Sequence, residues 1–243
     1  MKILRRFRGK NIKKNKIRKY ILYAIGEIVL VVIGILIALQ VNTWNEARRD
    51  RITEGRLLSN LLDDLKVNDQ ILRSAENAVA KQIDQTDQIL ELMKSKPVDS
   101  SLAKIDHLLY QGTEVAKVQL QMAGIRSLVN NKIELISNDS LKQLIIDYPI
   151  QFDRYIVLEN ILRGISTDRI RPKIKQHIYL GGLGGLSDNF SSDRKALLSD
   201  RTLANDFIDR KWESAEWENN LHDLRIKGQA LTNAIEMHIA TIK

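Results

Sequence analysis

The sequence has no cysteine and only three prolines among its 243 residues, and aromatic residues make up 5% of it. Without cysteine the chain can form no disulfide, no thiolate metal site and no cysteine nucleophile. Proline is the residue that most often interrupts a helix, and the stretch from Thr53 to Lys94 contains none. These absences favour long helices that are held together by side-chain packing rather than by covalent links.

Acidic residues are missing from the first 19 positions, which carry ten lysines and arginines. Positions 42–243 hold 28 basic and 29 acidic residues. The net charge of +8 therefore belongs to the N-terminal tail, and the main part of the chain is close to neutral. A nucleic-acid-binding domain carries its basic patch on the folded part, so the charge pattern argues against nucleic acid as a partner.

The longest apolar run covers residues 21–41 and contains two strongly polar residues, Glu27 and Gln40. About 20 apolar residues span a hydrocarbon core of roughly 30 Å. The Ile, Leu and Val residues of the run favour insertion by roughly 4 to 8 kcal/mol, whereas a central acid costs about 2.5 to 3.5 kcal/mol. We predict a basic cytoplasmic tail at 1–19 and a transmembrane anchor helix at 20–42.

The flanks of the anchor predict its orientation. A cleaved signal peptide has an apolar core of about 7–15 residues followed by small residues; this run is longer and continues into LQVNTW, which favours an uncleaved anchor. The basic tail places the N-terminus in the cytoplasm and residues 43–243 outside it. Tyr20 and Tyr23 suit one membrane interface, and Trp44 suits the other.

Glu27, Val31, Gly34 and Ala38 fall on one stripe of the anchor helix. Gly34 and Ala38 form a small-xxx-small pair, which allows close approach of a second helix. One interpretation is that this stripe contacts a partner helix, with Glu27 buried in the contact. The alternative is a glutamate near the membrane boundary that is kept protonated by desolvation.

The stretch YAIGEIVLVVIGILIALQVNTWNEARR, preceded by a basic tail, resembles the opening of the domain-of-unknown-function 6090 proteins. A looser similarity covers SLVNNKIELISNDSLKQLIIDY, from Ser127 to Tyr148. Proteins of that family are uncharacterised single-pass membrane proteins of Gram-negative Bacteroidota. The resemblance implies an inner-membrane protein with a helical periplasmic domain, and it supplies no activity, substrate or catalytic residue.

The exported part, 43–243, is predicted to be a helical domain, which makes the whole chain all-α. Apolar residues recur at three-four spacing in 53–95 and again in 200–242, which predicts two long helices that pack antiparallel in a bundle. The same stripes suit a coiled coil between chains, so packing within one chain or between chains stays open.

Shorter helices are predicted between the two long ones, within 101–178. The first runs from Leu102 to about Tyr110, and the next from about Glu114 to Asn130. Residues 180–199 contain four glycines and several serines, and this composition predicts a flexible loop.

Histidines, acids and a glycine-rich segment are present in the sequence, but their spacings do not match those of known catalytic, metal-binding or phosphate-binding motifs. Glu218 and His222 are four residues apart, which favours a surface ion pair over a metal site because no third ligand is near in sequence. His238 lies on an apolar stripe and is expected to be packed in the core. The glycine-rich segment lacks the Gly-Lys-Ser/Thr of a phosphate-binding loop. No catalytic, cofactor-binding or metal-ligating residue is predicted.

These observations predict a non-enzymatic envelope protein of the bacterial inner membrane. Its periplasmic helical domain would mediate self-association or binding to another envelope membrane protein, without a cofactor. A signalling or energy-coupling subunit that uses Glu27 is the alternative, since such subunits share the topology and an intramembrane acid. An envelope hydrolase is a weaker alternative, because no nucleophile-base spacing stands out.

Overall fold

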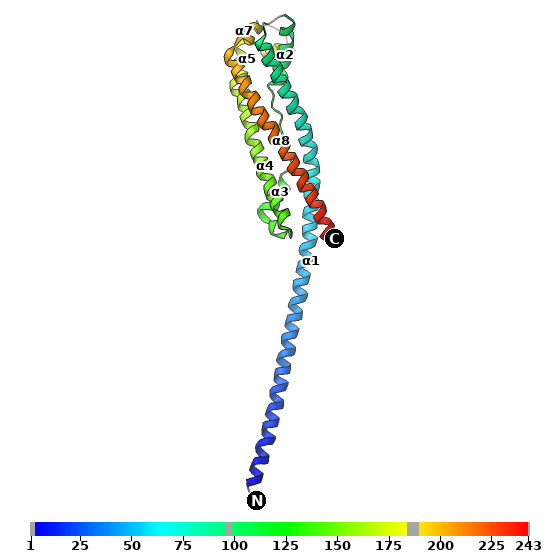
Figure 1. Ribbon diagram of the computed structural model, residues 1–243. Coiled ribbons are helices and arrows are strands. Elements are labelled where there is room, and N and C mark those ends of the chain that lie inside the picture. The colour runs from blue at the N-terminus through cyan, green and yellow to red at the C-terminus, as the bar shows by residue number, and fades with distance from the viewer. Residues whose placement is uncertain (1–2, 96–98, 184–189, 243) are drawn as a thin grey trace. The chain divides into compact units, whose positions relative to one another are not determined.

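Figure 1 shows the computed structural model of the chain, which describes residues 3–95, 99–183 and 190–242. In residues 3–18 and at positions 99–101, 103, 110, 182 and 183 it describes the backbone alone. The described residues contain helices and irregular segments but no strand, so the predicted all-α class is confirmed. Most side chains of the predicted basic tail at 1–19 lie outside the described set.

The chain divides into two compact units, Met1–Thr53 and Glu54–Lys243. Helix α1 (Ile3–Lys94) makes up the first unit and also supplies the opening helix of the second. The predicted anchor at 20–42 is therefore helical. Proline is absent up to position 94, so every backbone N–H of α1 is available for the helical hydrogen-bond ladder.

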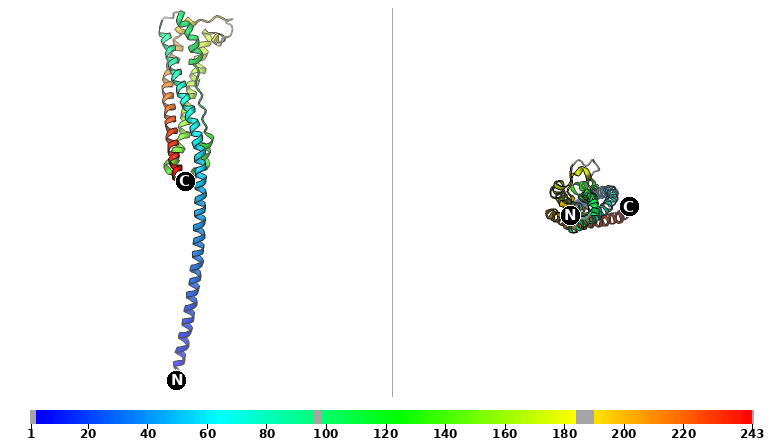
Figure 2. Two further views of the ribbon diagram at one scale, coloured as in Figure 1. Left: turned by 90° about the vertical axis from the view of Figure 1, so that its right-hand side faces the viewer. Right: turned by 90° about the horizontal axis from the view of Figure 1, so that it is seen from above.

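Three long helices of the second unit lie side by side: α1, α4 (Asp139–Gly164) and α8 (Arg201–Ile242) (Figures 1 and 2). Polar pairs define the direction of α1 against α8. Glu54 pairs with His238 at one end and Asp87 pairs with Lys211 at the other, so the two helices run antiparallel.

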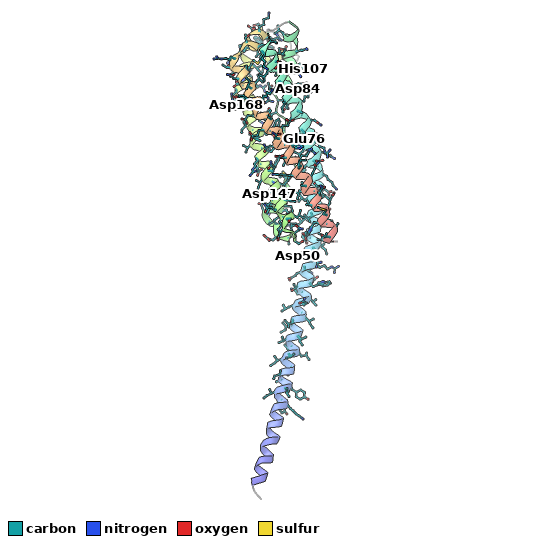
Figure 3. The ribbon with its side chains drawn as sticks, in the orientation of Figure 1. Asp50, Glu76, Asp84, His107, Asp147 and Asp168 are labelled. Atoms are coloured by element: carbon teal, nitrogen blue, oxygen red, sulfur yellow. The ribbon has the colours of Figure 1, made fainter. Side chains whose placement is uncertain are left out.

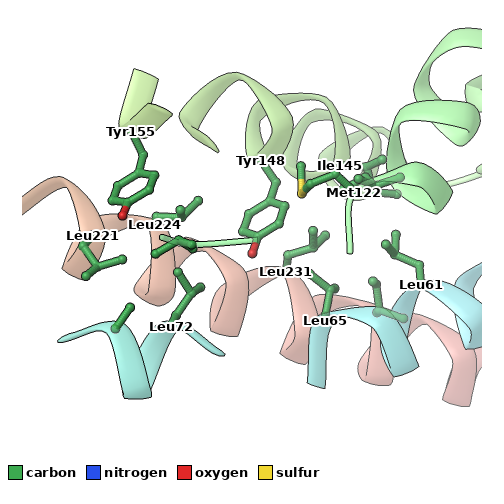
Figure 4. Close-up of a cluster of buried hydrophobic side chains, with 14 of the residues drawn as sticks. Leu61, Leu65, Leu72, Met122, Ile145, Tyr148, Tyr155, Leu221, Leu224 and Leu231 are labelled. Carbon is green, nitrogen blue, oxygen red and sulfur yellow. The ribbon is translucent and has the colours of Figure 1, made fainter. Parts of the chain in front are cut away.

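The closest helix pair is α4 with α8, which the sequence did not indicate. Gly228 of α8 makes this approach possible, because a Cβ at that position would lie 3.2 Å from the ring of Tyr148. Two turns further along α4, the ring of Tyr155 stacks on that of Trp217 of α8, with the ring centroids 6.3 Å apart. Figure 4 shows Tyr148 and Tyr155 extending from α4 toward α8. The bundle is thus centred on α8, with α1 and α4 on either side of its apolar face.

The buried side chains form two clusters. The larger one joins α1, α4, α8 and the segment before α4, and its α1 members recur at the three-four spacing read from the sequence: Leu58, Leu61, Leu65, Leu72, Ala75 and Val79. The smaller one gathers residues from the far end of α1 with the short helices around it and the start of α8: Ile89, Leu90, Ile105, Leu108, Leu109, Ile165, Ile170, Ile174, Ile178, Leu197, Leu198, Leu203 and Phe207.

The predicted helix from Glu114 to Asn130 is wrong over its first half. Residues 114–122 form an extended segment outside any helix (Figure 1), except that its last residue, Met122, has helical backbone angles. Helix α3 begins at Ala123 and ends at Asn131. Side chains in the extended segment alternate in burial: Val118 and Met122 are buried, and Lys117 and Gln121 are exposed. This two-residue period is the strand pattern, and it is present in the sequence as V-x-L-x-M.

Side chains replace the missing partner strand along this extended segment. The Asn68 amide donates to the carbonyl oxygen of Gln121 at 3.1 Å, and its oxygen accepts from the Gln121 N–H at 2.7 Å. The Glu159 carboxylate accepts from the Val118 N–H at 3.4 Å. Asn68 is 1% exposed on α1 and Glu159 is 7% exposed on α4. These two buried side chains therefore bond backbone groups of Val118 and Gln121 that would have bonded within a helix had the helix prediction been right.

The remaining elements are short. Helix α2 covers Asp99–Gly112, and the 3₁₀ turn η1 covers Ile133–Leu135. After α4, the π-helix η2 (Ile165–Ile170) leads into α5 (Arg171–His177).

The segment predicted as a flexible loop, 180–199, contains the helices α6 (Leu180–Leu183) and α7 (Arg194–Ser199). Its residues 184–189 lie outside the described part of the chain. Two side chains anchor α7: Asp193 accepts from the Ala196 N–H at 2.9 Å, and Arg194 forms an ion pair with Asp106 of α2 at 2.6 Å. The loop prediction is therefore wrong at both ends of the segment, at α6 and at α7, and a capping aspartate starts the second of these helices.

The two Asn68 hydrogen bonds predict a marked loss of stability on truncation. Asn68→Ala removes both partners of the Gln121 backbone, and leaving part-buried backbone groups unpaired costs about 1–3 kcal/mol. We expect the full-length protein in detergent to unfold at lower urea concentration, as measured by circular dichroism. Asn60→Ala, at an exposed position of the same helix, serves as the control and should change the free energy of unfolding by less than about 0.5 kcal/mol. An equal loss in the free energy of unfolding for both variants would contradict the stabilising role of the two Asn68 hydrogen bonds.

Candidate functional site

The predicted membrane segment is exposed on all sides within its unit. From Tyr20 to Val41, every residue of α1 is exposed, and none of the 18 residues of its most apolar window is buried. A helix that is apolar all round belongs in the core of a large protein or in a membrane. Among the described residues, one helix is long and apolar enough to cross a membrane, by length and composition.

The predicted interface residues sit at the two ends of this segment. Tyr20, Tyr23 and Trp44 are all well exposed, and at 1.5 Å per residue the axial distance from Tyr20 to Trp44 is about 36 Å. This spacing fits a hydrocarbon core of roughly 30 Å with an aromatic ring at each boundary. Their role as anchors stays a prediction.

The predicted interaction stripe lies on one face of the same helix. Glu27 and Val31 border a shallow groove that Ala24, Ile28 and Val32 complete. At Gly34 a Cβ would meet no atom within 4 Å, so the surface is open at that position. Ala38 follows one turn later and is also exposed. The four stripe residues thus offer a narrow face of small and β-branched side chains with one carboxylate.

His222 is paired with Glu76 of α1 rather than with Glu218. Its Nδ1 lies 3.1 Å from Glu76 Oε1, and the same carboxylate accepts from Arg225 Nε at 2.8 Å (Glu76 is labelled in Figure 3). The prediction of an ion pair between Glu218 and His222 is therefore replaced by a bond between helices. No group of three or more His, Cys, Asp or Glu side chains that could hold a metal ion occurs in the part of the chain whose side chains are described.

His238 is packed, as its place on the apolar stripe predicts, with its side chain 10% exposed, and it takes part in a polar cluster. Its Nε2 lies 2.8 Å from Oε1 of Glu54, which is 1% exposed. Ser137 donates its backbone N–H to the same oxygen at 2.8 Å, and its hydroxyl lies 3.1 Å from that oxygen and 3.4 Å from His238 Nε2. The cluster connects α1, the segment before α4 and the end of α8.

Serine, histidine and glutamate in contact raise the question of a catalytic triad. In a triad one imidazole nitrogen faces the acid and the other faces the serine hydroxyl. Here a single nitrogen, Nε2 of His238, is the atom that approaches both Glu54 and Ser137. The arrangement cannot relay a proton from the serine through the ring, and it fits a structural clamp. The sequence signal for it is a polar residue at the end of each apolar stripe, Glu54 before Leu58 and His238 after Ile235.

The clamp predicts a coupling energy between α1 and α8. In a double-mutant cycle of Glu54→Ala and His238→Ala, we expect a coupling of about 1–3 kcal/mol in the free energy of unfolding, because Glu54 is buried and directly bonded to the largely covered His238. The exposed pair Lys66–Glu236, with 3.8 Å between charged atoms, is the matched control on the same two helices and should give less than about 1 kcal/mol. Equal couplings would overturn the clamp.

Comparison with known proteins identifies a family for the chain but does not assign an activity to it. No curated protein and no solved structure matches the chain. A family model described as a family of unknown function matches residues 27–158, which is more than half of the chain. The match begins inside the apolar segment at Glu27, crosses the clamp residues Glu54 and Ser137, and ends within α4. The chain belongs to this family of unknown function, DUF6090.

Proposed function

We propose that the protein is a single-pass membrane protein whose helical second unit acts by binding another copy or another membrane protein. The observation that carries the proposal is the apolar helix at 20–41, which no other part of its unit covers. Such a surface is stable only in a lipid bilayer or against other apolar helices, because exposing it to water is strongly unfavourable.

The orientation in the proposal rests on charge. Ten basic residues precede the apolar segment and no acidic residue balances them, so the positive-inside rule keeps this end in the cytoplasm. The second unit then lies outside the cytoplasm. Together with the resemblance to single-pass proteins of Gram-negative bacteria, this orientation makes the inner membrane and the periplasm the proposed location.

The stripe Glu27–Val31–Gly34–Ala38 is the proposed contact surface within the membrane. A carboxyl group at this depth is costly unless it meets a polar partner or water. Gly34 and Ala38 leave room for a second helix to approach closely, which brings backbone and side chains into van der Waals contact. A partner helix that packs on this stripe would cover Glu27 at the same time.

The polar side chains of the second unit mostly link its own helices, and none of those described above forms a catalytic arrangement. The ion pairs between helices, such as Lys211 with Asp87 and Arg225 with Glu76, join α1 to α8 along the bundle. The cluster of Ser137 and His238 around the buried Glu54 lacks the relay geometry of a nucleophile. A non-enzymatic role is therefore part of the proposal.

A single cysteine tests the stripe, and the cysteine-free chain makes the experiment clean. We expect Val31→Cys, oxidised in native membranes, to give a disulfide-linked product that mass spectrometry identifies as a homodimer or as a link to one other membrane protein. Val29→Cys is the control, because at 100° per residue it lies on the opposite face of the helix. Equal yields at both positions, or no product at Val31→Cys, would contradict the stripe.

The orientation has its own test. Asn219 is exposed on α8, and we expect Asn219→Cys to react with a membrane-impermeant maleimide in cells whose outer membrane has been permeabilised. A cysteine in place of Asn11, in the basic tail, should react only after the inner membrane is broken. The reverse pattern would place the second unit in the cytoplasm and overturn the proposed location.

A further inference from the structure

A half-open cleft of about 500 Å³ lies in the second unit, at the end of the bundle where the smaller core cluster lies. One wall is the end of α2 with the start of the extended segment, and the other is the end of α4 with η2 and α5. Its apolar lining consists of Leu109, Val115, Ile174 and Leu180. A volume of this size is typical of small-molecule sites.

Positive charge predominates among the polar groups of the cleft. Lys117, Arg163 and Arg171 line it, against a single acid, Glu114. Arg163 is already paired with Glu159 at 2.7 Å. Lys117 and Arg171 form no ion pair with any side chain that the structure describes, so two cations line the cleft without a directly bonded acid.

A third uncompensated cation lies directly behind the cleft wall. Arg210 of α8 is 1% exposed. Its guanidinium donates to Ser166 Oγ and, at 2.6 Å, to the carbonyl oxygen of Glu114, and both of these residues line the cleft. Its Nε has no hydrogen-bond partner among the described residues. Burial lowers the pKa of Arg210 to about 10, so it remains charged at neutral pH.

Buried cations in proteins are normally paired with a carboxylate, because an unpaired charge loses its hydration without compensation. The acid one turn before Arg210 on α8 is Asp206, and it is occupied. Its carboxylate accepts from Arg169 at 2.6 Å and from Lys173. Arg169 also pairs with Asp209 at 2.5 Å. The two acids and two bases therefore neutralise one another and leave Arg210 with neutral hydrogen-bond partners alone.

The backbone at the cleft has an unusual form. Residues Ile165–Ile170 are a π-helix between α4 and α5, and Ser166 and Thr167 on this widened turn both line the cleft. A π-turn is less stable than an α-turn and occurs frequently at functional sites. It brings the Ser166 hydroxyl between the guanidinium of Arg210 and the cleft.

We propose that this cleft binds a small anionic amphiphile, a molecule with a carboxylate or phosphate group and an apolar body. Lys117 and Arg171 hold the anionic group. Arg210 donates to the Ser166 hydroxyl oxygen, and its positive charge behind the wall adds to the positive potential in the cleft. The guanidinium of Arg171 suits the planar or forked oxygens of such a group. The apolar body packs on Leu109, Val115, Ile174 and Leu180. The proposal is independent of the membrane stripe, which lies in the other unit.

Isothermal titration of the full-length protein in nanodiscs of zwitterionic lipid tests the site. The probes are octanoate and octyl phosphate, with octanol and inorganic phosphate as partial ligands. We expect saturable binding of at least one amphiphilic anion, and at least tenfold weaker binding of octanol and of inorganic phosphate. Equal binding of octanol would overturn the role of the cations, and equal binding of inorganic phosphate would overturn the role of the apolar wall.

Variants locate the binding in the cleft. Lys117→Gln with Arg171→Gln removes two exposed cations, so the fold should be kept, and we expect at least a tenfold loss of affinity. Lys81→Gln with Arg201→Gln removes the same charge at exposed positions away from the cleft lining and should leave the affinity unchanged. When Lys117→Gln is combined with Arg171→Lys instead of Arg171→Gln, part of the lost affinity should return. Absence of saturable binding, or equal loss in both double variants, would overturn the proposal.

The two natural sources of such an anion are distinguished by what the purified protein carries. Native mass spectrometry that finds a phospholipid bound to the wild type and absent from the Lys117→Gln, Arg171→Gln variant assigns a lipid headgroup. A free fatty acid or other soluble amphiphile with the same dependence assigns a diffusible ligand. A bound molecule that persists equally in the variant lies elsewhere and contradicts the site.

Discussion

Burial of the apolar face of α8 is the interaction on which the second unit depends. Trp217, Leu221, Leu224, Leu231 and Ile235 are at most 1% exposed, and they belong to one core cluster with residues of α1 and α4. Each fully buried side chain of this kind contributes about 1.5–3 kcal/mol relative to exposure. Neither α1 nor α4 could cover that face alone, because an apolar stripe of this width on a helix needs a neighbour on each side.

The polar groups specify how the helices are aligned along this apolar face. A leucine stripe alone would tolerate a shift of one turn, since most of its contacts are interchangeable. The buried bond between Glu54 and His238 permits one register between α1 and α8, and the approach of Gly228 to the Tyr148 ring permits one register between α4 and α8. Packing therefore supplies most of the stability, and these few contacts select the arrangement.

Much of this bundle could be predicted because its helices are long and strongly periodic. The three-four spacing of leucines in α1 predicted both its helical form and the face that it buries. The segment 114–122 could not be recognised in the same way, because its alternating pattern is short and its partners are the side chains of Asn68 and Glu159 rather than a second strand. A local pattern carries no information about a partner that is distant in sequence.

The two candidate sites differ in the same way, in whether a local sequence pattern describes them. The membrane stripe follows from helical periodicity and was predicted residue by residue. The cleft depends on α2, η2 and α8 coming together, which periodicity does not describe. One signal for it was nevertheless present. Leu203, Phe207, Arg210, Ser214 and Trp217 continue the four-three alternation of α8, so an arginine and a serine stand at positions that the pattern reserves for the core.

Stability alone does not explain an arginine at such a position. Replacing buried charged groups by apolar side chains of similar size is often neutral or stabilising, and Arg210 lacks the carboxylate that would offset its desolvation. Its hydrogen bonds lead to Ser166 and Glu114, which belong to the cleft wall rather than to the bundle core. The π-turn at Ile165–Ile170 is a second local departure from the most stable backbone, and it lies at the same wall. Two unfavourable features converge on one surface, and a ligand at the proposed site would explain both, whereas the packing of the bundle explains neither.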